Sequence, residues 1–155
     1  MMEIYTVSFF GHRDFHRHFE LADKLDTILR DLIKTKTYVD FLVGRNGEFD
    51  SFVSSSIRHA RKVYDDSNSS HILILPYPTA EYMNNEESFN NYYDEIEICY
   101  NASISHFKSA IGVRNREMVD RSDLVICCIE DTHGGAFVAI EYARRTCKKI
   151  INLAE

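Results

Sequence analysis

The chain has 155 residues, of which 45% are hydrophobic and 27% charged, with six glycines, two prolines and a formal net charge of -6. This length suits one domain with its own core, and the composition excludes collagen-like, low-complexity and disordered proteins. The sequence has no apolar run long enough to cross a membrane and no basic stretch before its first apolar segment, so neither a membrane protein nor a secretory leader is expected.

Apolar runs alternate along the chain with amphipathic segments. Strands are predicted at 4–10, 38–43, 71–75, 96–98, 124–129 and 150–153. Helices are predicted around 21–32, at 52–64 with Asp50 as the N-cap, within the segment 79–101, at 103–121 with a break near Gly112, and from Gly134 to Cys147. Nearly continuous apolar strands separated by helices are typical of a parallel sheet covered on both faces. We therefore predict one α/β domain over residues 1–155, a Rossmann-like three-layer sandwich with a mostly parallel, doubly wound sheet.

The excess negative charge lies in one segment, residues 79–101, which holds six acidic residues and no Lys or Arg. Without these six acids the chain has 18 acidic and 18 basic residues. Tyr and Phe side chains interleave the acids. Three interpretations remain open: a mobile lid whose aromatics stack on a base, a subunit contact in a homodimer, or a solvated insertion whose tyrosines pack on the sheet.

The four cysteines show no CxxC spacing, and Cys127 and Cys128 lie in an apolar strand. We expect reduced core thiols in a cytoplasmic protein. His12, His16 and His18 cluster without a Cys or a closely spaced pair of acids to complete a site, so no metal is expected. GxGxxG, GxxxxGK[ST], GxSxG and HExxH are all absent, and no cofactor is predicted.

Glycines and charged residues follow several predicted strands. In open α/β sheets, ligands bind beyond the carboxyl ends of the strands, where glycine allows close backbone approach and helix starts favour anions. Glycine also ends strands for purely local reasons, which is the competing interpretation. The candidate ligand-binding residues at these ends are Gly11, His12, Arg13, Gly44, Arg45, Gly47, Asp50, Gly134 and Gly135.

Several of these segments resemble the SLOG superfamily. The similar segments are Phe9–Arg13, residues 41–50, the stretch 114–124 with its pattern RN-x-x-MVD-x-SD, and Gly134–Gly135. The likeness is greatest to the YpsA-like members, mostly small bacterial proteins of unassigned activity. The resemblance implies a pocket for a nucleotide or nucleotide derivative and adds Arg114 and Asn115 to the candidate ligand-binding residues. Both would stand at a helix start after Gly112, where a solvated, capped turn is the alternative.

The same superfamily contains the Lonely Guy phosphoribohydrolases, whose signature resembles PGGxGTxxE. Residues 133–141 match its two leading glycines, Gly134 and Gly135, and its final glutamate, Glu141, but not its proline, third glycine or threonine. Phe137 stands at the position of the missing glycine. Glu141 has two interpretations: a carboxylate that stabilises an oxocarbenium-like centre, or an ion pair with Arg144 or Arg145.

Three functions follow as hypotheses. The first is a nucleotide-ligand sensor or sequestering module without turnover. The second is a nucleoside-monophosphate N-glycosidase with Glu141 or Asp50 as the catalytic carboxylate. The third is a nucleic-acid module using a basic strip of Arg13, Arg17, Arg45 and Arg116, and the net charge of -6 argues against it.

Overall fold

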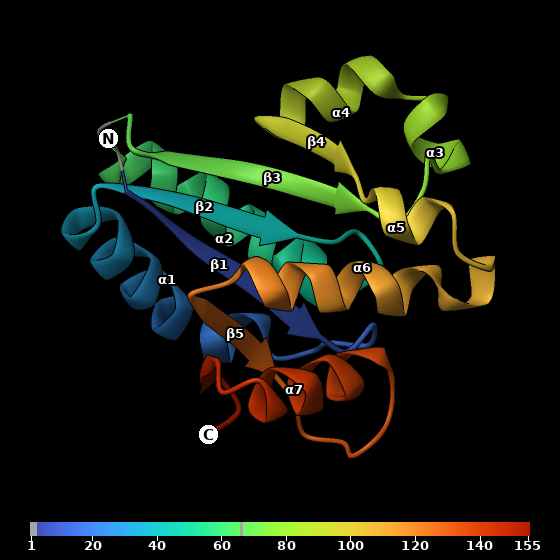
Figure 1. The fold of residues 1–155 in the computed structure, drawn as a ribbon. Helices are drawn as coiled ribbons and strands as arrows, with labels where there is room; N and C mark the ends of the chain where they lie inside the picture. The colour runs from blue at the N-terminus through green and yellow to red at the C-terminus, as the bar shows by residue number, and fades with distance from the viewer. Residues whose placement is uncertain (1–2, 66) are drawn as a thin grey trace.

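The computed structural model describes residues 3–65 and 67–155 (Figure 1). Within them, six strands form one sheet in the order β4-β3-β2-β1-β5-β6, and every neighbouring pair is parallel. The strands are β1 (Ile4–Gly11), β2 (Tyr38–Val43), β3 (Ser69–Leu75), β4 (Glu95–Ile98), β5 (Leu124–Cys128) and β6 (Lys149–Asn152). The helices are α1 (His18–Thr35), α2 (Glu48–Tyr64), α3 (Ala80–Met83), α4 (Glu86–Tyr92), α5 (Tyr100–Ser103), α6 (Phe107–Arg121) and α7 (Gly135–Arg145).

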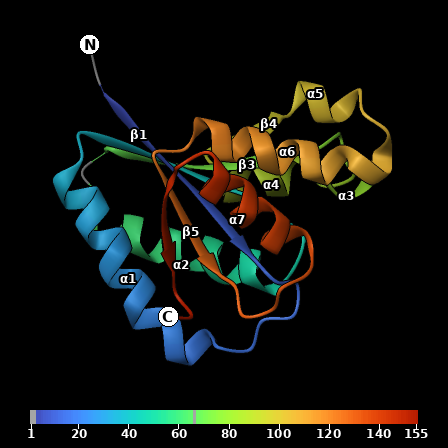
Figure 2. The ribbon, with the colours of Figure 1, turned by 60° about the horizontal axis from the view of Figure 1, so that its bottom comes forward.

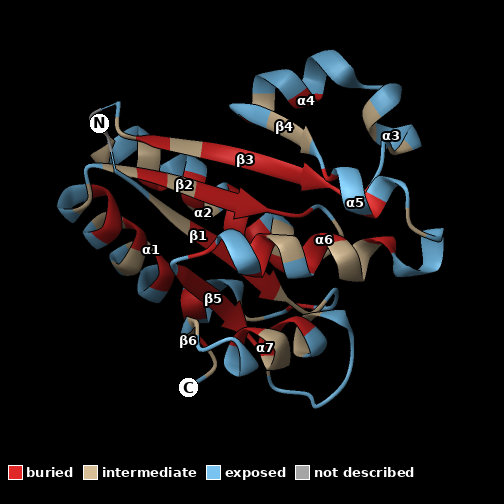
Figure 3. Cartoon of the chain, in the orientation of Figure 1, coloured by how far each residue is buried: buried red, intermediate tan, exposed pale blue. Residues whose placement is uncertain are grey.

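The sheet divides the apolar core into two clusters. Alternate strand side chains face opposite sides, so Phe9 packs with α1 and α2, whereas its neighbour Phe10 packs with α6 and α7. Figure 3 shows the resulting buried strands between helices that are exposed on their outer faces. The predicted Rossmann-like three-layer sandwich is confirmed, with a sheet that is parallel throughout.

Strand order reverses at β1, which pairs with β2 on one side and β5 on the other. The helices that follow β1 and β2 pack on one face, and those flanking β5 pack on the opposite face (Figure 2). Connections that leave in opposite directions open a crevice at the carboxyl ends of the strands. The fold therefore places any ligand site beyond Gly11, which pairs with Cys128 at the end of β5.

Two sequence predictions about helix limits are wrong. The predicted break near Gly112 is absent, because α6 runs unbroken from Phe107 to Arg121. Its buried residues, which include Ala110 and Met118 on either side of the glycine, pack on the core and offset the poor helix propensity of Gly112. Helix α7 ends at Arg145, so Cys147 lies outside it and is exposed, whereas the other three cysteines are buried.

The acidic segment contributes to the sheet. It contains the edge strand β4, and its Phe89 and Tyr93 side chains are buried in the core cluster under α2. Arg45 donates to the Glu81 carboxylate at 2.9 Å and to the Tyr93 hydroxyl at 3.0 Å, and its guanidinium lies 4.5 Å from the centre of the Phe89 ring. These contacts hold the segment against the end of β2. Its aromatic side chains pack as expected for the insertion interpretation, except for Tyr100, which is 71% exposed.

Candidate functional site

A cavity of about 250 Å³ lies at the carboxyl ends of β1 and β2, under α6 and beside the start of α7. Its walls come from four segments of the chain, residues 9–13, 44–50, 111–118 and 134–136. The lining residues are Phe9, Phe10, Gly11, His12, Arg13, Gly44, Asn46, Asp50, Ile111, Arg114, Asn115, Met118, Gly134, Gly135 and Ala136. The fold thus brings together every predicted ligand-binding residue except Arg45 and Gly47.

Arg114 is the charged group that defines the cavity, and only 3% of the residue is exposed. Its Nε and Nη2 donate to Asn115 Oδ1 at 3.1 and 2.8 Å, and its Nη1 donates to the Ile74 carbonyl at 3.1 Å. These acceptors are uncharged, and no ion pair joins Arg114 to a carboxylate in residues 3–65 and 67–155. Burial lowers the pKa of Arg114, because desolvation disfavours a cation, while the nearby charge of Asp50 opposes this fall. Such a cation at a cavity wall favours an anionic ligand.

Asp50 supplies a carboxylate to the same cavity. It is the third residue of α2 rather than the predicted N-cap, a position that Gly47 occupies. Its Oδ2 accepts the Asn46 N–H at 2.8 Å, which closes the loop before the helix. Burial raises the pKa of Asp50, while this hydrogen bond and the positive charge of Arg114 oppose the rise.

Packing accounts for two of the glycines that the sequence assigned to ligand contact. A Cβ atom on Gly11 would lie 2.2 Å from Cγ of Phe49, a fully buried core residue. A Cβ atom on Gly47 would lie 2.5 Å from the Cα atom of Arg13. Glu48 N–H also donates to the Arg13 carbonyl at 2.8 Å, so the two loops lie in direct contact. Both glycines therefore allow neighbouring segments to approach, and Gly47 does not line the cavity.

Gly134 and Gly135 begin α7 at the opposite wall. Gly134 is the N-cap and has φ 95°, a left-handed conformation that favours glycine. A Cβ atom on Gly135 would meet nothing within 4 Å, so its backbone is open on that side. The first amides of a helix lack intrahelical acceptors and carry partial positive charge. This wall therefore adds hydrogen-bond donors to the charge of Arg114.

Arg45, Glu141 and Phe137 do not line the cavity. The side chain of Arg45 turns away from the cavity and binds the acidic segment. Glu141 also lies outside the cavity and forms an ion pair with Arg144, the contact that the second of its two interpretations expects. Phe137 lies beside Glu141 in a separate groove and does not obstruct the cavity.

Arg114 and Asn115 lie in the middle of α6 rather than at a helix start. They reach the cavity because the helix crosses above the strand ends. Phe9, Phe10, Asn46 and Ala136 line the cavity without having been predicted as ligand-binding residues, and so do Ile111 and Met118 on α6. Their spacing of three and four residues from Arg114 marks one helical face, and this signal would have identified them.

Of the three clustered histidines, His12 lines the cavity, whereas His16 and His18 do not. His16 Nδ1 lies 3.8 Å from Glu48 Oε2, and both side chains are largely exposed. In the part of the chain that the structure describes, no three His, Cys, Asp or Glu residues are placed to hold a metal ion, and no helix is long and apolar enough to span a bilayer.

Comparison with known proteins gives likenesses of structure. No family model and no curated protein matches the sequence. The similar solved structures include TM1055, a structural-genomics target, with a TM-score of 0.61 and 17% identity over 94% of this chain and 72% of that one. They also include DNA processing protein A from Helicobacter pylori, described with a single-stranded DNA binding mode, with a TM-score of 0.62 and 19% identity over 94% of this chain. The same protein from Streptococcus pneumoniae has a TM-score of 0.65 and 12% identity over 95% of this chain.

The chain spans 63% and 49% of the two DNA processing protein A chains. At these identities the comparisons establish a shared fold. That fold is the Rossmann-like fold expected from the sequence, while membership of the SLOG superfamily and of its YpsA-like group stays a prediction.

Proposed function

We propose that this protein binds a phosphorylated, nucleotide-type small molecule in the cavity at the strand ends. The observation that carries the proposal is the buried Arg114 guanidinium, which faces a cavity and has only uncharged hydrogen-bond acceptors. A phosphate would supply an anion in direct hydrogen-bond contact with Arg114, and the guanidinium fork suits a bidentate pair with it.

The other walls suit the same ligand. The first amides of α7 at Gly135 and Ala136 would donate to phosphate oxygens, as helix starts commonly do. Arg13 lies exposed at the rim and would add attraction from solvent. His12 also lines the cavity, and its ring nitrogens are potential hydrogen-bond partners for a ligand. These groups belong to a binding module and require no reaction.

Calorimetric titration with AMP and with inorganic phosphate tests the proposal, alongside thermal unfolding. A ligand at 100 times its Kd stabilises the native state by about 2.7 kcal/mol. We expect wild type to bind and Arg114→Met to lose binding while it remains folded by circular dichroism. The matched control is Arg116→Met, the same change at an exposed position of α6. Equal binding by Arg114→Met and wild type, or no binding by wild type, would contradict the proposal.

Hydrolysis of an N-glycosidic bond is the second candidate, and it now depends on Asp50 alone because Glu141 lies elsewhere. The observation in its favour is that burial raises the pKa of this cavity carboxyl, as in catalytic acids. Chromatographic detection of free adenine from AMP tests it. Release by wild type that stops in Asp50→Asn would establish turnover, and absence of release at high enzyme concentration would leave binding without catalysis.

A nucleic-acid role has weaker support. Of the four arginines in the expected basic strip, Arg17 pairs with Glu20 and Glu130, and Arg45 pairs with Glu81. Exposed cations that already have carboxylate partners contribute less to phosphate binding. A fluorescence titration with a labelled single-stranded oligonucleotide at two salt concentrations would detect such binding by its salt dependence.

A further inference from the structure

One face of α6 carries a continuous line of side chains toward the sheet. Met118, Arg114 and Ile111 recur at spacings of four and three residues and all line the cavity. Phe107 lies four residues before Ile111, so it continues the same line by one more turn. Helical geometry thus directs Phe107 to the side of α6 that faces the ligand.

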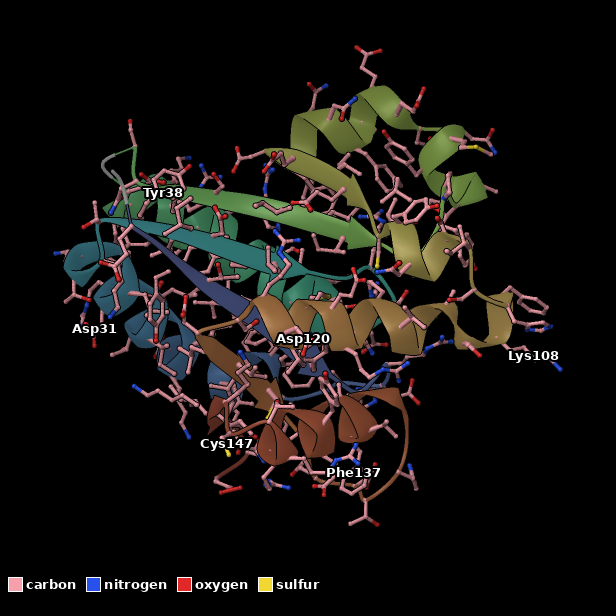
Figure 4. The ribbon with its side chains drawn as sticks, in the orientation of Figure 1. Asp31, Tyr38, Lys108, Asp120, Phe137 and Cys147 are labelled. Carbon is pink, nitrogen blue, oxygen red and sulfur yellow. The ribbon has the colours of Figure 1, made fainter. Side chains whose placement is uncertain are left out.

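No strand lies beneath the first turn of α6, which contains Phe107. Figures 1 and 2 both show the first turns of α6 extending past the arrowheads of the central strands. Figure 4 places Lys108 at the outer tip of the helix, away from the body of the domain. Phe107 is consequently 69% exposed although it lies on the inward face. Its ring stacks on His106, with centroids 5.1 Å apart and planes inclined by 25°.

The size of the cavity limits what it encloses. Pockets that take a whole drug-sized ligand usually measure about 300–1,000 Å³. The volume here is about 250 Å³, and its polar groups, Arg114 and the start of α7, are those that suit a phosphate. The enclosed part therefore suits a phosphate and sugar, and the remainder of a nucleotide would extend outward past Ile111.

We propose that the ligand's heterocyclic base lies outside the enclosed cavity and stacks on Phe107, with Ile111 as the apolar wall between base and phosphate sites. This inference rests on the proposed function, and it names the base as the part of the ligand that Phe107, in the first turn of α6, recognises. Aromatic stacking tolerates any base, so the site selects nucleotides over sugar phosphates rather than one base over another. Phe107 would therefore determine the specificity for nucleotides over sugar phosphates.

Calorimetric titrations that compare the affinities for AMP and for ribose 5-phosphate test the inference. Stacking of a base on an aromatic side chain contributes about 1–3 kcal/mol, and 1.4 kcal/mol corresponds to a factor of ten. We expect Phe107→Ala to weaken AMP binding about ten-fold and to leave ribose 5-phosphate binding unchanged. Phe107→Tyr should retain AMP affinity. The matched control is Phe19→Ala, which removes a fully exposed phenylalanine from α1.

The outcomes separate this inference from the proposed function. If wild type binds neither compound, both fail. If wild type binds both and Phe107→Ala binds AMP normally, the phosphate site stands and the base site is overturned. An exposed aromatic side chain can also serve as a contact between two copies of the chain. Sedimentation velocity on the same variants tests for such a dimer. A wild-type dimer that dissociates in Phe107→Ala without a change in AMP affinity would also overturn the inference.

Discussion

The guanidinium of Arg114 and the carboxylate of Asp50 both lie beside the space that a side chain at Gly44 would fill. A Cβ atom at position 44 would lie 3.1 Å from Nη1 of the arginine and 3.2 Å from Oδ2 of the aspartate. The two charges come from α6 and α2, on opposite faces of the sheet, and they share one cavity wall. The charge of Asp50 therefore opposes the attraction that Arg114 exerts on an anion.

Neutralising Asp50 should strengthen anion binding. We expect Asp50→Asn to bind sulfate several-fold more tightly than wild type, because the amide oxygen can still accept the Asn46 N–H while the opposing charge is gone. Burial raises the pKa of Asp50, so in wild type the affinity should increase as pH falls through that pKa, when the carboxylate takes up a proton. Sulfate keeps its charge over this range.

Calorimetric titrations with sulfate from pH 7 to pH 4 check this prediction. The pH dependence should be smaller in Asp50→Asn than in wild type. Equal slopes in the two proteins would show that another group controls the anion site.

Substitution of Gly11 should destabilise the fold. A methyl group there would overlap the ring of Phe49, which is fully buried and has no free space to move into. We expect Gly11→Ala to lower the free energy of unfolding by about 1–3 kcal/mol, the usual cost of overpacking. Gly135→Ala is the matched control, because its new methyl group meets nothing within 4 Å. Urea unfolding should separate the two variants, and equal stability would contradict the packing role of Gly11.

Substitution of Gly112 with alanine should stabilise the fold, in contrast to Gly11→Ala. Gly112 lies inside α6, and a Cβ atom there would contact only Arg116 Nη1, at an ordinary 3.8 Å. Replacing a mid-helix glycine with alanine stabilises a helix by about 0.5–1 kcal/mol when nothing clashes. Gly112→Ala should therefore raise the unfolding midpoint in thermal denaturation without changing AMP affinity. A lower midpoint would mean that the glycine serves a contact absent from this structure.

His71 should make the protein sensitive to acid. It is fully buried in β3, and its Nε2 lies 3.0 Å from the Ser54 hydroxyl. Burial, together with the charges of Arg61 and Arg58, lowers the pKa of His71 to about 3. The unfolded chain, with a histidine pKa near 6.5, binds the proton first, so stability falls as pH drops from about 6.5 toward 3.

The decrease in the free energy of unfolding that His71 causes would reach about 4–5 kcal/mol at about pH 3, since each pKa unit corresponds to about 1.4 kcal/mol. Urea unfolding at pH 7, 5 and 4 measures it. His71→Gln keeps a polar group for Ser54 and removes the titration, so its stability should fall less across the same range. Parallel curves for the two proteins would exclude His71 as the cause.

Sequence patterns predicted the secondary structure closely wherever one physical signal dominated. The apolar runs of β1, β2, β3 and β5 reflect burial on both faces, and this burial requires helices on each side of a parallel sheet. The pattern failed inside α6, where propensity at Gly112 suggested a break. Packing of the buried residues on both sides stabilises the helix there more than one glycine weakens it.

The sequence alone determined the layered fold and the strand ends at which Gly11, Gly44 and Gly134 meet, because hydrophobic periodicity and chain direction are local properties. Only the tertiary structure decided what each polar residue does there. It turned Arg45 toward Glu81 and buried Arg114 against the cavity, although both are arginines near a glycine. Side-chain partners depend on which segments the sheet brings together, and that information lies in contacts between residues far apart in the chain.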